Sequence, residues 1–185
     1  MHANDHLSRR EFLELSARLG AAGVAATGLP RAAWSEETPS TSPNERIRLG
    51  FIGVGARGLQ VLEEFLKQPD VEVTAICDVW GDHIRQAVEK CPNKPSEIKD
   101  YRDLLSRKDV DAVVICTPPH WHCLQAIHAC ESGKDFYIEK PMTMSVGESL
   151  AVRNAVRHHN RITQIGTQIH AGDNYRRVVE IVRSG

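Results

Sequence analysis

The sequence is poor in aromatic residues and carries almost no net charge. Aromatic side chains make up 5% of its 185 residues, and the formal net charge is -1. A nearly neutral chain lacks the basic excess with which nucleic-acid-binding proteins attract phosphates. It also lacks a run of about 20 apolar residues, the length that a membrane-spanning helix needs. The composition therefore predicts a globular protein with neither a nucleic-acid partner nor a stable membrane span.

Paired cysteines are lacking as well. The chain has five cysteines, an odd number without C-x-x-C spacing. Cys77 and Cys116 lie in apolar runs, where a buried thiol behaves as a small hydrophobic side chain. One later segment crowds several potential metal ligands together: His120, His122, Cys123, His128 and Cys130. Their spacing does not match a zinc signature, so we expect neither a disulfide framework nor a metal site.

The N-terminal segment has the pattern of an export signal. Arg9 and Arg10 are followed by Glu-Phe-Leu and then by a weakly apolar, Ala/Gly-rich stretch. The pair resembles the twin-arginine signal, which exports proteins that are already folded. We expect residues 1–34 to direct the protein to the periplasm or outside the cell; a cytoplasmic amphipathic arm is the alternative. Residues 35–45 are polar and contain proline, which predicts a flexible linker.

From residue 46 onward, short β-rich runs alternate with helical periodicity. The runs that predict strands are residues 47–53, 71–77, 112–116, 136–138 and 162–166. Helical patterns cover residues 59–66, 82–89, 101–106, 120–131, 145–159 and 175–185. Gly133 has the place of a helix C-terminal glycine, and Ser145 with Glu148 has capping-box spacing. The alternation predicts an α/β, Rossmann-type, doubly wound parallel sheet over residues 46–185.

A glycine-rich loop connects the first predicted strand to the first helix. It reads Gly53-Val54-Gly55-Ala56-Arg57-Gly58 and matches G-x-G-x-x-G. In a strand–loop–helix context, Gly53 permits the tight turn, Gly55 lets a pyrophosphate approach, and Gly58 allows close helix–strand packing. The helix N-terminus offers N–H groups to phosphates. We expect all six loop residues to take part in binding a dinucleotide.

Asp78 ends the second predicted strand, 20 residues after Gly58. A carboxylate there accepts hydrogen bonds from the adenosine ribose and repels a 2′-phosphate, so it favours NAD over NADP. Arg57 leaves NADP open, because a nearby arginine can accommodate the extra phosphate. A plain strand–turn–helix in which Asp78 caps the next helix is the alternative without a ligand.

Three further segments directly follow predicted strands. They are Thr117-Pro118-Pro119-His120-Trp121-His122, Glu139-Lys140-Pro141 and Gly166-Thr167-Gln168. With the glycine loop, they resemble the glucose–fructose oxidoreductase / inositol dehydrogenase / rhizopine-catabolism (Gfo/Idh/MocA) family. The resemblance implies that Thr117, Pro118, His122 and Gln168 belong to the cofactor site. It also implies that Glu139 and Lys140 lie near the nicotinamide ribose and the sugar hydroxyls.

The resemblance further implies NAD-dependent oxidation of a secondary alcohol of a sugar or polyol. Lys140 would be the catalytic residue, since a positioned cation stabilises the alkoxide that develops on the reacting hydroxyl. In the family a second, α+β domain follows, with an acid/base histidine and often the oligomer interface. We therefore expect this chain to be a fragment without that domain, and the full-length protein to be a homo-oligomer.

Two other functions remain open. One is a hydrolase or lyase that oxidises its sugar transiently and keeps NAD bound, and the other is a cofactor-binding module without turnover. Hydrolytic members of the family depart from E-K-P at the lysine, so Lys140 favours the oxidoreductase.

Overall fold

A computed structural model of the chain describes residues 46–168 and 172–185, so the predicted signal and linker lie outside the described residues. Its strands are β1 (Ile47–Ile52), β2 (Val71–Cys77), β3 (Ser96–Ile98), β4 (Ala112–Ile115), β5 (Asp135–Glu139) and β6 (Thr163–Gly166). Its helices are α2 (Ala56–Phe65), α3 (Gly81–Lys90), α4 (Tyr101–Leu105), α5 (Pro119–Glu131), α6 (Val146–His159) and α7 (Asp173–Ser184). Strands and helices alternate along the chain, as predicted.

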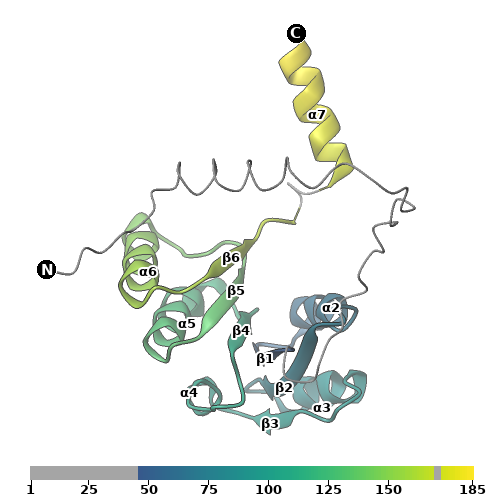
Figure 1. Ribbon diagram of the computed structural model, residues 1–185, viewed down its shortest axis with the longest axis vertical. Helices are drawn as coiled ribbons and strands as arrows, with labels where there is room; N and C mark the ends of the chain where they lie inside the picture. Colours follow the sequence, from purple (N-terminus) through teal and green to yellow (C-terminus); the bar gives the residue numbers. More distant parts are fainter. Residues whose placement is uncertain (1–45, 169–171) are drawn as a thin grey trace, which may run out of the picture. The chain divides into compact units, whose positions relative to one another are not determined.

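The strands form one parallel sheet in the order β3-β2-β1-β4-β5-β6 (Figure 1). The order runs outward in one direction from β1 and in the other from β4. This reversal defines a doubly wound fold and creates a crevice at the carboxyl ends of β1 and β4. The predicted fold class is confirmed.

Each face of the sheet has its own hydrophobic core. On one face, Phe51 packs with Leu62 of α2 and Ile84 of α3. On the other face, Ile115 packs with helices α4, α5 and α6, for example with Ala126. Burying each large apolar side chain contributes about 1.5–3 kcal/mol. Because both faces are covered, all four residues of β4 are apolar, which is why its sequence reads as a continuous run.

The predicted helix boundaries depend on local hydrogen bonds. Gly133 follows α5 with a φ of 71°, which a glycine adopts without steric cost. Ser145 Oγ accepts the Glu148 N–H at 3.2 Å, and Glu148 Oε2 accepts the Met144 N–H at 2.8 Å. The first bond satisfies an N–H group in the first turn of α6, and the second satisfies the N–H group of the residue that precedes the cap. The capping signals in the sequence are confirmed.

The short strand β3 is absent from the predicted pattern. It has three residues with a single apolar side chain, Ile98, so no alternation marks it. Backbone pairing with β2 holds it in place, with Ala75 opposite Ser96 and Cys77 opposite Ile98. Its carboxyl end leads into α4 and brings that helix to the crevice.

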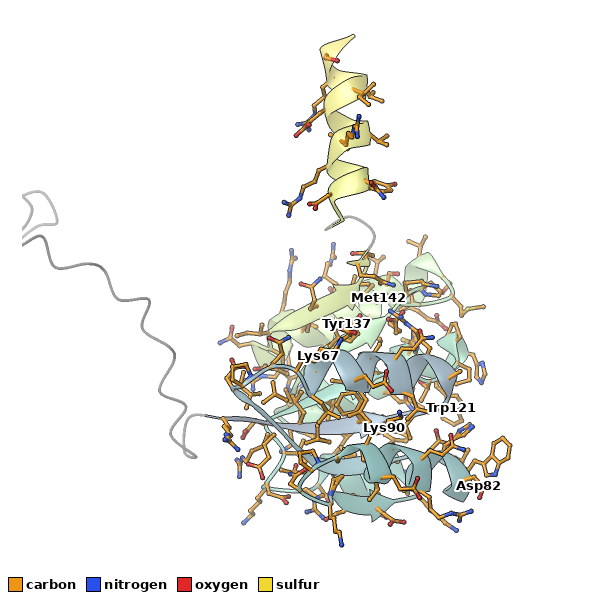
Figure 2. The ribbon with its side chains drawn as sticks, turned by 90° about the vertical axis from the view of Figure 1, so that its right-hand side faces the viewer. Lys67, Asp82, Lys90, Trp121, Tyr137 and Met142 are labelled. Atoms are coloured by element: carbon orange, nitrogen blue, oxygen red, sulfur yellow. The ribbon has the colours of Figure 1, made fainter. Side chains whose placement is uncertain are left out.

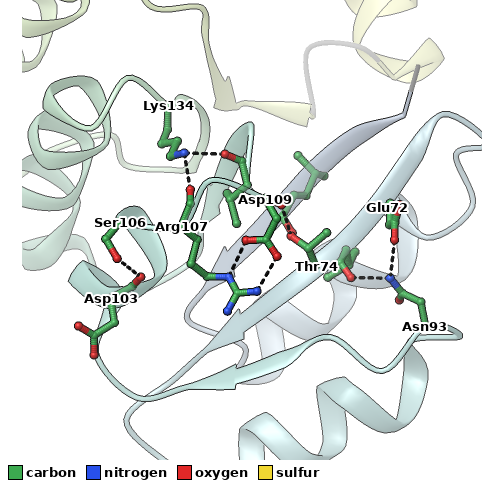
Figure 3. A network of polar contacts seen from close by, with 11 residues as sticks. Glu72, Thr74, Asn93, Asp103, Ser106, Arg107, Asp109 and Lys134 are labelled. Carbon is green, nitrogen blue, oxygen red and sulfur yellow. Dashed lines mark hydrogen bonds and ion pairs between the residues drawn. The ribbon is translucent and has the colours of Figure 1, made fainter. Parts of the chain in front are cut away.

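A polar network closes the opposite edge of the sheet, where the strands begin (Figure 3). Lys134 Nζ donates to the carbonyl oxygens of Arg107 at 2.7 Å and Val110 at 2.6 Å. Thr74 Oγ1 donates to the Asp109 carbonyl oxygen at 2.8 Å. These bonds join the loops before β4 and β5 to β2. The cleft described below lies at the other, carboxyl edge of the sheet.

The described residues contain neither a candidate membrane-spanning helix nor a disulfide bond. Within residues 46–168 and 172–185, no helix is long and apolar enough to cross a bilayer. All five cysteines have free thiols, and Cys77, Cys91 and Cys130 are buried. The chain therefore has no disulfide among these residues.

Candidate functional site

A cleft of about 790 Å³ lies at the carboxyl edge of the sheet, where the strand order reverses. Ligand pockets in proteins commonly have volumes of about 300–1,000 Å³. The sequence-predicted residues that line it are Gly53, Gly55, Ala56, Arg57, Gly58, Asp78, Thr117 and Pro118. The other predicted site residues, Val54, His122, Glu139, Lys140 and Gln168, are not among the lining residues. The glycine loop, Asp78 and the turn after β4 therefore line the cleft, whereas the predicted residues of E-K-P and G-T-Q do not.

The glycine loop has the geometry that its sequence predicts. Gly53 has a φ of 84°, and its N–H donates to the Cys77 carbonyl oxygen at 2.8 Å. A Cβ at Gly58 would overlap the Gly53 carbonyl oxygen, so only glycine lets α2 start this close to β1. Gly55 precedes α2, and no side chain caps the N-terminus of this helix. Its first N–H groups are therefore available to an anion such as a phosphate.

Asp78 directly follows β2 and is fixed by the backbone around it. Its Oδ2 accepts the Val54 N–H at 2.8 Å, and its Oδ1 accepts the Trp80 N–H at 2.9 Å. The side chain is 10% exposed and lines the cleft. Oδ2 also lies 3.4 Å from Nδ1 of His83, whereas Oδ1 keeps a second lone pair that a ribose hydroxyl can use. Val54 itself is buried, so it contributes to the site through its N–H rather than its side chain.

Arg57 points toward β5 rather than toward Asp78. Its Nη2 and Nε both donate to Glu139 Oε1, at 2.7 and 3.0 Å. Its Nη1 donates to Gln60 Oε1 at 3.2 Å. In the sheet, β1 and β4 separate β2, which Asp78 directly follows, from β5, which ends at Glu139. In this conformation Arg57 is not placed to receive a 2′-phosphate at the adenosine ribose.

Glu139 is a buried carboxylate surrounded by donors. It is 4% exposed and also accepts the Tyr137 hydroxyl at 3.2 Å and the Lys140 N–H at 3.1 Å. Burial alone would raise its pKa, but the hydrogen bonds from Arg57 and Lys140 outweigh burial, and the pKa is lowered. The same ion pair raises the pKa of Arg57. Glu139 is therefore ionised at neutral pH and held in one place.

Gln168, of the G-T-Q element, reaches the same guanidinium. With its amide oxygen facing Arg57, it accepts from Nη2 at 2.9 Å, and its amide nitrogen donates to the Gly166 carbonyl oxygen. A Cβ at Gly166 would overlap the Tyr137 hydroxyl, so glycine is needed where β6 passes β5 here. The glycine loop, E-K-P and G-T-Q thus meet at Arg57.

His122 connects two of the motifs without facing the cleft. It is 1% exposed, and its ring lies between two carbonyl oxygens, with Nε2 2.8 Å from Thr117 O and Nδ1 2.7 Å from Pro141 O. The first oxygen belongs to the turn after β4 and the second to E-K-P, whose Lys140–Pro141 peptide bond is cis. Lys140 is exposed directly after β5. Direct cofactor contacts of His122 and Lys140 stay predictions.

Aromatic side chains at the cleft are the main feature that sequence reasoning missed. Trp80, His83 and Tyr101 line it, and so does Trp121 of the segment that follows β4. The Trp80 and His83 rings lie 4.6 Å apart, and those of Tyr101 and Trp121 6.4 Å apart. Figure 2 shows Trp121 at the same edge of the domain as Asp82, away from Lys67. The sequence signal that could have indicated Trp80, His83 and Tyr101 is their position directly after β2 and β3, at the carboxyl edge where ligands bind.

The histidine- and cysteine-rich segment is placed mostly by packing. His128 Nδ1 lies 2.9 Å from the Tyr101 hydroxyl, and Cys130 is buried in the core. In the described part of the chain, no group of three His, Cys, Asp or Glu side chains could hold a metal ion. Burial raises the pKa of Cys77 and Cys116, which line the cleft, to about 12. These thiols are therefore poor nucleophiles at neutral pH.

Sequence comparisons match the domain with one family. The profile of the GFO/IDH/MocA family, described as an oxidoreductase family with an NAD-binding Rossmann fold, matches residues 47–167. A glycosyl hydrolase family 109 protein of Shewanella pealeana is 31% identical over 97% of the chain. A protein of the same name from Shewanella baltica is 33% identical, also over 97% of the chain. The chain spans 43% of the length of each of these relatives.

Solved structures show the same fold. A 3-ketoreductase from Actinomadura kijaniata, in complex with TDP-benzene and NADP, is 26% identical with a TM-score of 0.70 over 76% of this chain and 44% of that one. A scyllo-inositol dehydrogenase from Lactobacillus casei with bound NAD(H) and scyllo-inositol has a TM-score of 0.69 at 24% identity. That match covers 76% of this chain and 42% of the dehydrogenase.

Proposed function

The chain belongs to the GFO/IDH/MocA oxidoreductase family, and we propose that it holds the NAD of an enzyme that oxidises a secondary alcohol of a sugar or polyol. One observation carries the proposal: the open cleft at the strand-order reversal joins the glycine loop to Asp78. The absence of a side-chain cap on α2 suits a pyrophosphate. The fixed carboxylate suits a ribose with both hydroxyls and so favours NAD over NADP.

The residues of the carboxyl edge divide between the two halves of the cofactor. Asp78, after β2, suits the adenosine ribose, and Thr117 and Pro118 line the cleft after β4. NAD, when bound, supplies the hydride acceptor. Lys140, exposed at the end of β5, would hold the hydroxyl of the substrate and stabilise the negative charge that develops as its proton leaves. Positioning by a cation of this kind is expected to contribute about 10²–10⁴-fold in rate.

A second candidate is favoured by the names of the relatives from Shewanella. Both are called glycosyl hydrolase family 109 proteins, and both align with nearly the whole chain. We therefore keep the alternative of a glycosidase or lyase that oxidises its sugar transiently and recovers the hydride. The two functions need the same cofactor cleft. They differ in whether NADH leaves the enzyme.

Counting NADH per product in the full-length protein separates the two functions. With a sugar or polyol dehydrogenase, each molecule of oxidised product is accompanied by one NADH. With the alternative, glycoside cleavage proceeds with NAD no more abundant than enzyme, and no NADH accumulates. Cofactor binding without either product would leave only a binding module.

The assignment of Lys140 is tested in the same full-length protein. Lys140→Ala is expected to lower kcat by about 10²–10⁴-fold and leave NAD affinity nearly unchanged. Lys67→Ala is the matched control, because Lys67 is an exposed lysine paired with Glu64 on the surface. A change confined to KM would identify Lys140 as a binding residue instead.

Export by the twin-arginine route stays part of the proposal. The basis is the Arg9–Arg10 pair ahead of an Ala/Gly-rich segment. Replacing both arginines by lysine is expected to retain the full-length protein in the cytoplasm, because the route recognises the guanidinium pair. Arg31→Lys serves as the control outside the pair. Unchanged export of the double variant would contradict the assignment. The association of full-length copies likewise stays a prediction.

A further inference from the structure

We propose that Arg57 is a positioning residue that ties the glycine loop to the ends of β5 and β6 and thereby fixes Glu139 and Lys140 for the nicotinamide half of the cofactor. The inference rests on the proposed NAD-binding function and deepens it. The position of Arg57 in the glycine loop suggests that it contacts a phosphate directly. The inference assigns it a positioning role instead.

The hydrogen bonds of the guanidinium show how the tie is built. Nε and one N–H of Nη2 hold Glu139, the other N–H of Nη2 reaches Gln168, and Nη1 holds Gln60. Together these contacts occupy most of the N–H donors that an arginine has. A lysine has the charge but not the planar fork, so it cannot hold Glu139 and Gln168 in this geometry.

The charge balance also favours positioning over phosphate binding. The Glu139 side chain is 6% exposed and that of Arg57 is 41% exposed, with 2.7 Å between Nη2 and Oε1. The carboxylate therefore neutralises the cation at close range, on the side away from solvent. Little net positive charge is left to attract a pyrophosphate. The backbone N–H groups at the start of α2 are better placed for that task.

The position in the sheet identifies the half of the cofactor that is affected. A dinucleotide in a doubly wound fold lies across the reversal point of the strand order. If its adenosine half lies at Asp78, on the β2 side, the other half lies over β4, β5 and β6. Arg57 holds Glu139 at the end of β5, and Glu139 Oε2 holds the Lys140 N–H. Loss of Arg57 should therefore disturb the nicotinamide end and leave the adenosine end intact.

A double-mutant cycle with two ligands tests the proposal on the 185-residue chain. Arg57→Met, Glu139→Gln and the double variant are titrated with NADH and with ADP, which has both phosphates but no nicotinamide. We expect Arg57→Met to weaken NADH binding about tenfold and ADP binding less than about twofold. In the Glu139→Gln background, Arg57→Met should add little, because Arg57 acts through Glu139.

Several outcomes overturn the proposal. Equal weakening of NADH and ADP by Arg57→Met in both backgrounds would show that Arg57 binds a phosphate directly. Unchanged NADH binding would show that it positions nothing. If Arg57→Met does not fold, Arg57→Lys replaces it in the titrations. This variant should weaken the binding of NADH but not of ADP, and an unaltered NADH affinity would refute the positioning role of Arg57. Arg85→Met, which removes an exposed arginine paired with Asp82, is the control. Failure of the unmodified chain to bind NADH would refute the proposed function instead.

Discussion

Replacing Asp78 by alanine tests both tasks of this carboxylate. The substitution leaves the Val54 N–H without its acceptor at a residue that is 0% exposed. An unsatisfied buried donor costs about 1–3 kcal/mol, and we expect the free energy of unfolding to fall by that amount. Trp80 is an exposed residue, so its N–H can donate to water once Asp78 is gone, and its loss should change the free energy of unfolding little.

The same substitution removes the acceptor for the adenosine ribose. A hydrogen bond to a charged group contributes about 1.5–3 kcal/mol, so NAD affinity should fall about ten- to hundredfold. NADP should lose less, because the repulsion of its 2′-phosphate disappears as well. Asp78→Asn should show intermediate losses, since one of its amide hydrogens must face a backbone N–H.

Urea unfolding and parallel titrations with NAD and NADP measure these effects. Asp82→Ala is the matched control: it removes an acid four residues away that is exposed and paired with Arg85. The control should change neither affinity nor stability appreciably. Tighter binding of NADP than of NAD by the unmodified chain would refute the reasoning. So would an Asp78→Ala variant with unaltered affinity for NAD.

Three further predictions concern the loop, the buried carboxylate and the buried histidine. Gly58→Ala should cost about 1–3 kcal/mol of stability and abolish NADH binding, because its Cβ would overlap the Gly53 carbonyl oxygen; a variant with normal melting and binding would contradict this. The pKa of Glu139 is lower in the folded than in the unfolded chain, so its stabilisation is complete above the unfolded-state pKa and is lost as pH falls through the folded-state pKa. Urea unfolding between neutral and acidic pH should therefore show a smaller loss of stability for Glu139→Gln than for the unmodified chain, and parallel curves would disprove it. His122→Phe should lower the free energy of unfolding by about 1–3 kcal/mol, because it removes the ring N–H donor that lies between the carbonyl oxygens of Thr117 and Pro141; calorimetry showing no change would rule out the link.

The fold could be predicted because its signals are local. The apolar run of β4 and the capping residues Ser145 and Glu148 each act within a few positions of the chain. The strand β3 escaped prediction because backbone pairing with β2, rather than its own side chains, holds it. Periodicity detects buried faces, and a strand of three residues with one apolar side chain has almost none.

The candidate site could be predicted only where its residues are consecutive. The glycine loop, the turn after β4 and E-K-P are contiguous motifs, and topology brings them to one edge of the sheet. Contacts between the motifs have no sequence signal. Examples are the ion pair of Arg57 with Glu139 and the link of His122 to Pro141, which join residues 82 and 19 positions apart. Only the folded chain shows that Arg57 faces β5.

Binding of NADH to the 185-residue chain is the most direct test of the central claim, that the cleft at the carboxyl edge holds NAD. Trp80 and Trp121 line this cleft, so a nicotinamide dinucleotide bound there should quench tryptophan emission and receive energy from it. We expect a saturable change with added NADH that NAD reverses by competition, and a much weaker response in Asp78→Ala. Emission that declines only linearly up to millimolar NADH, without competition by NAD, would contradict the assignment of this cleft.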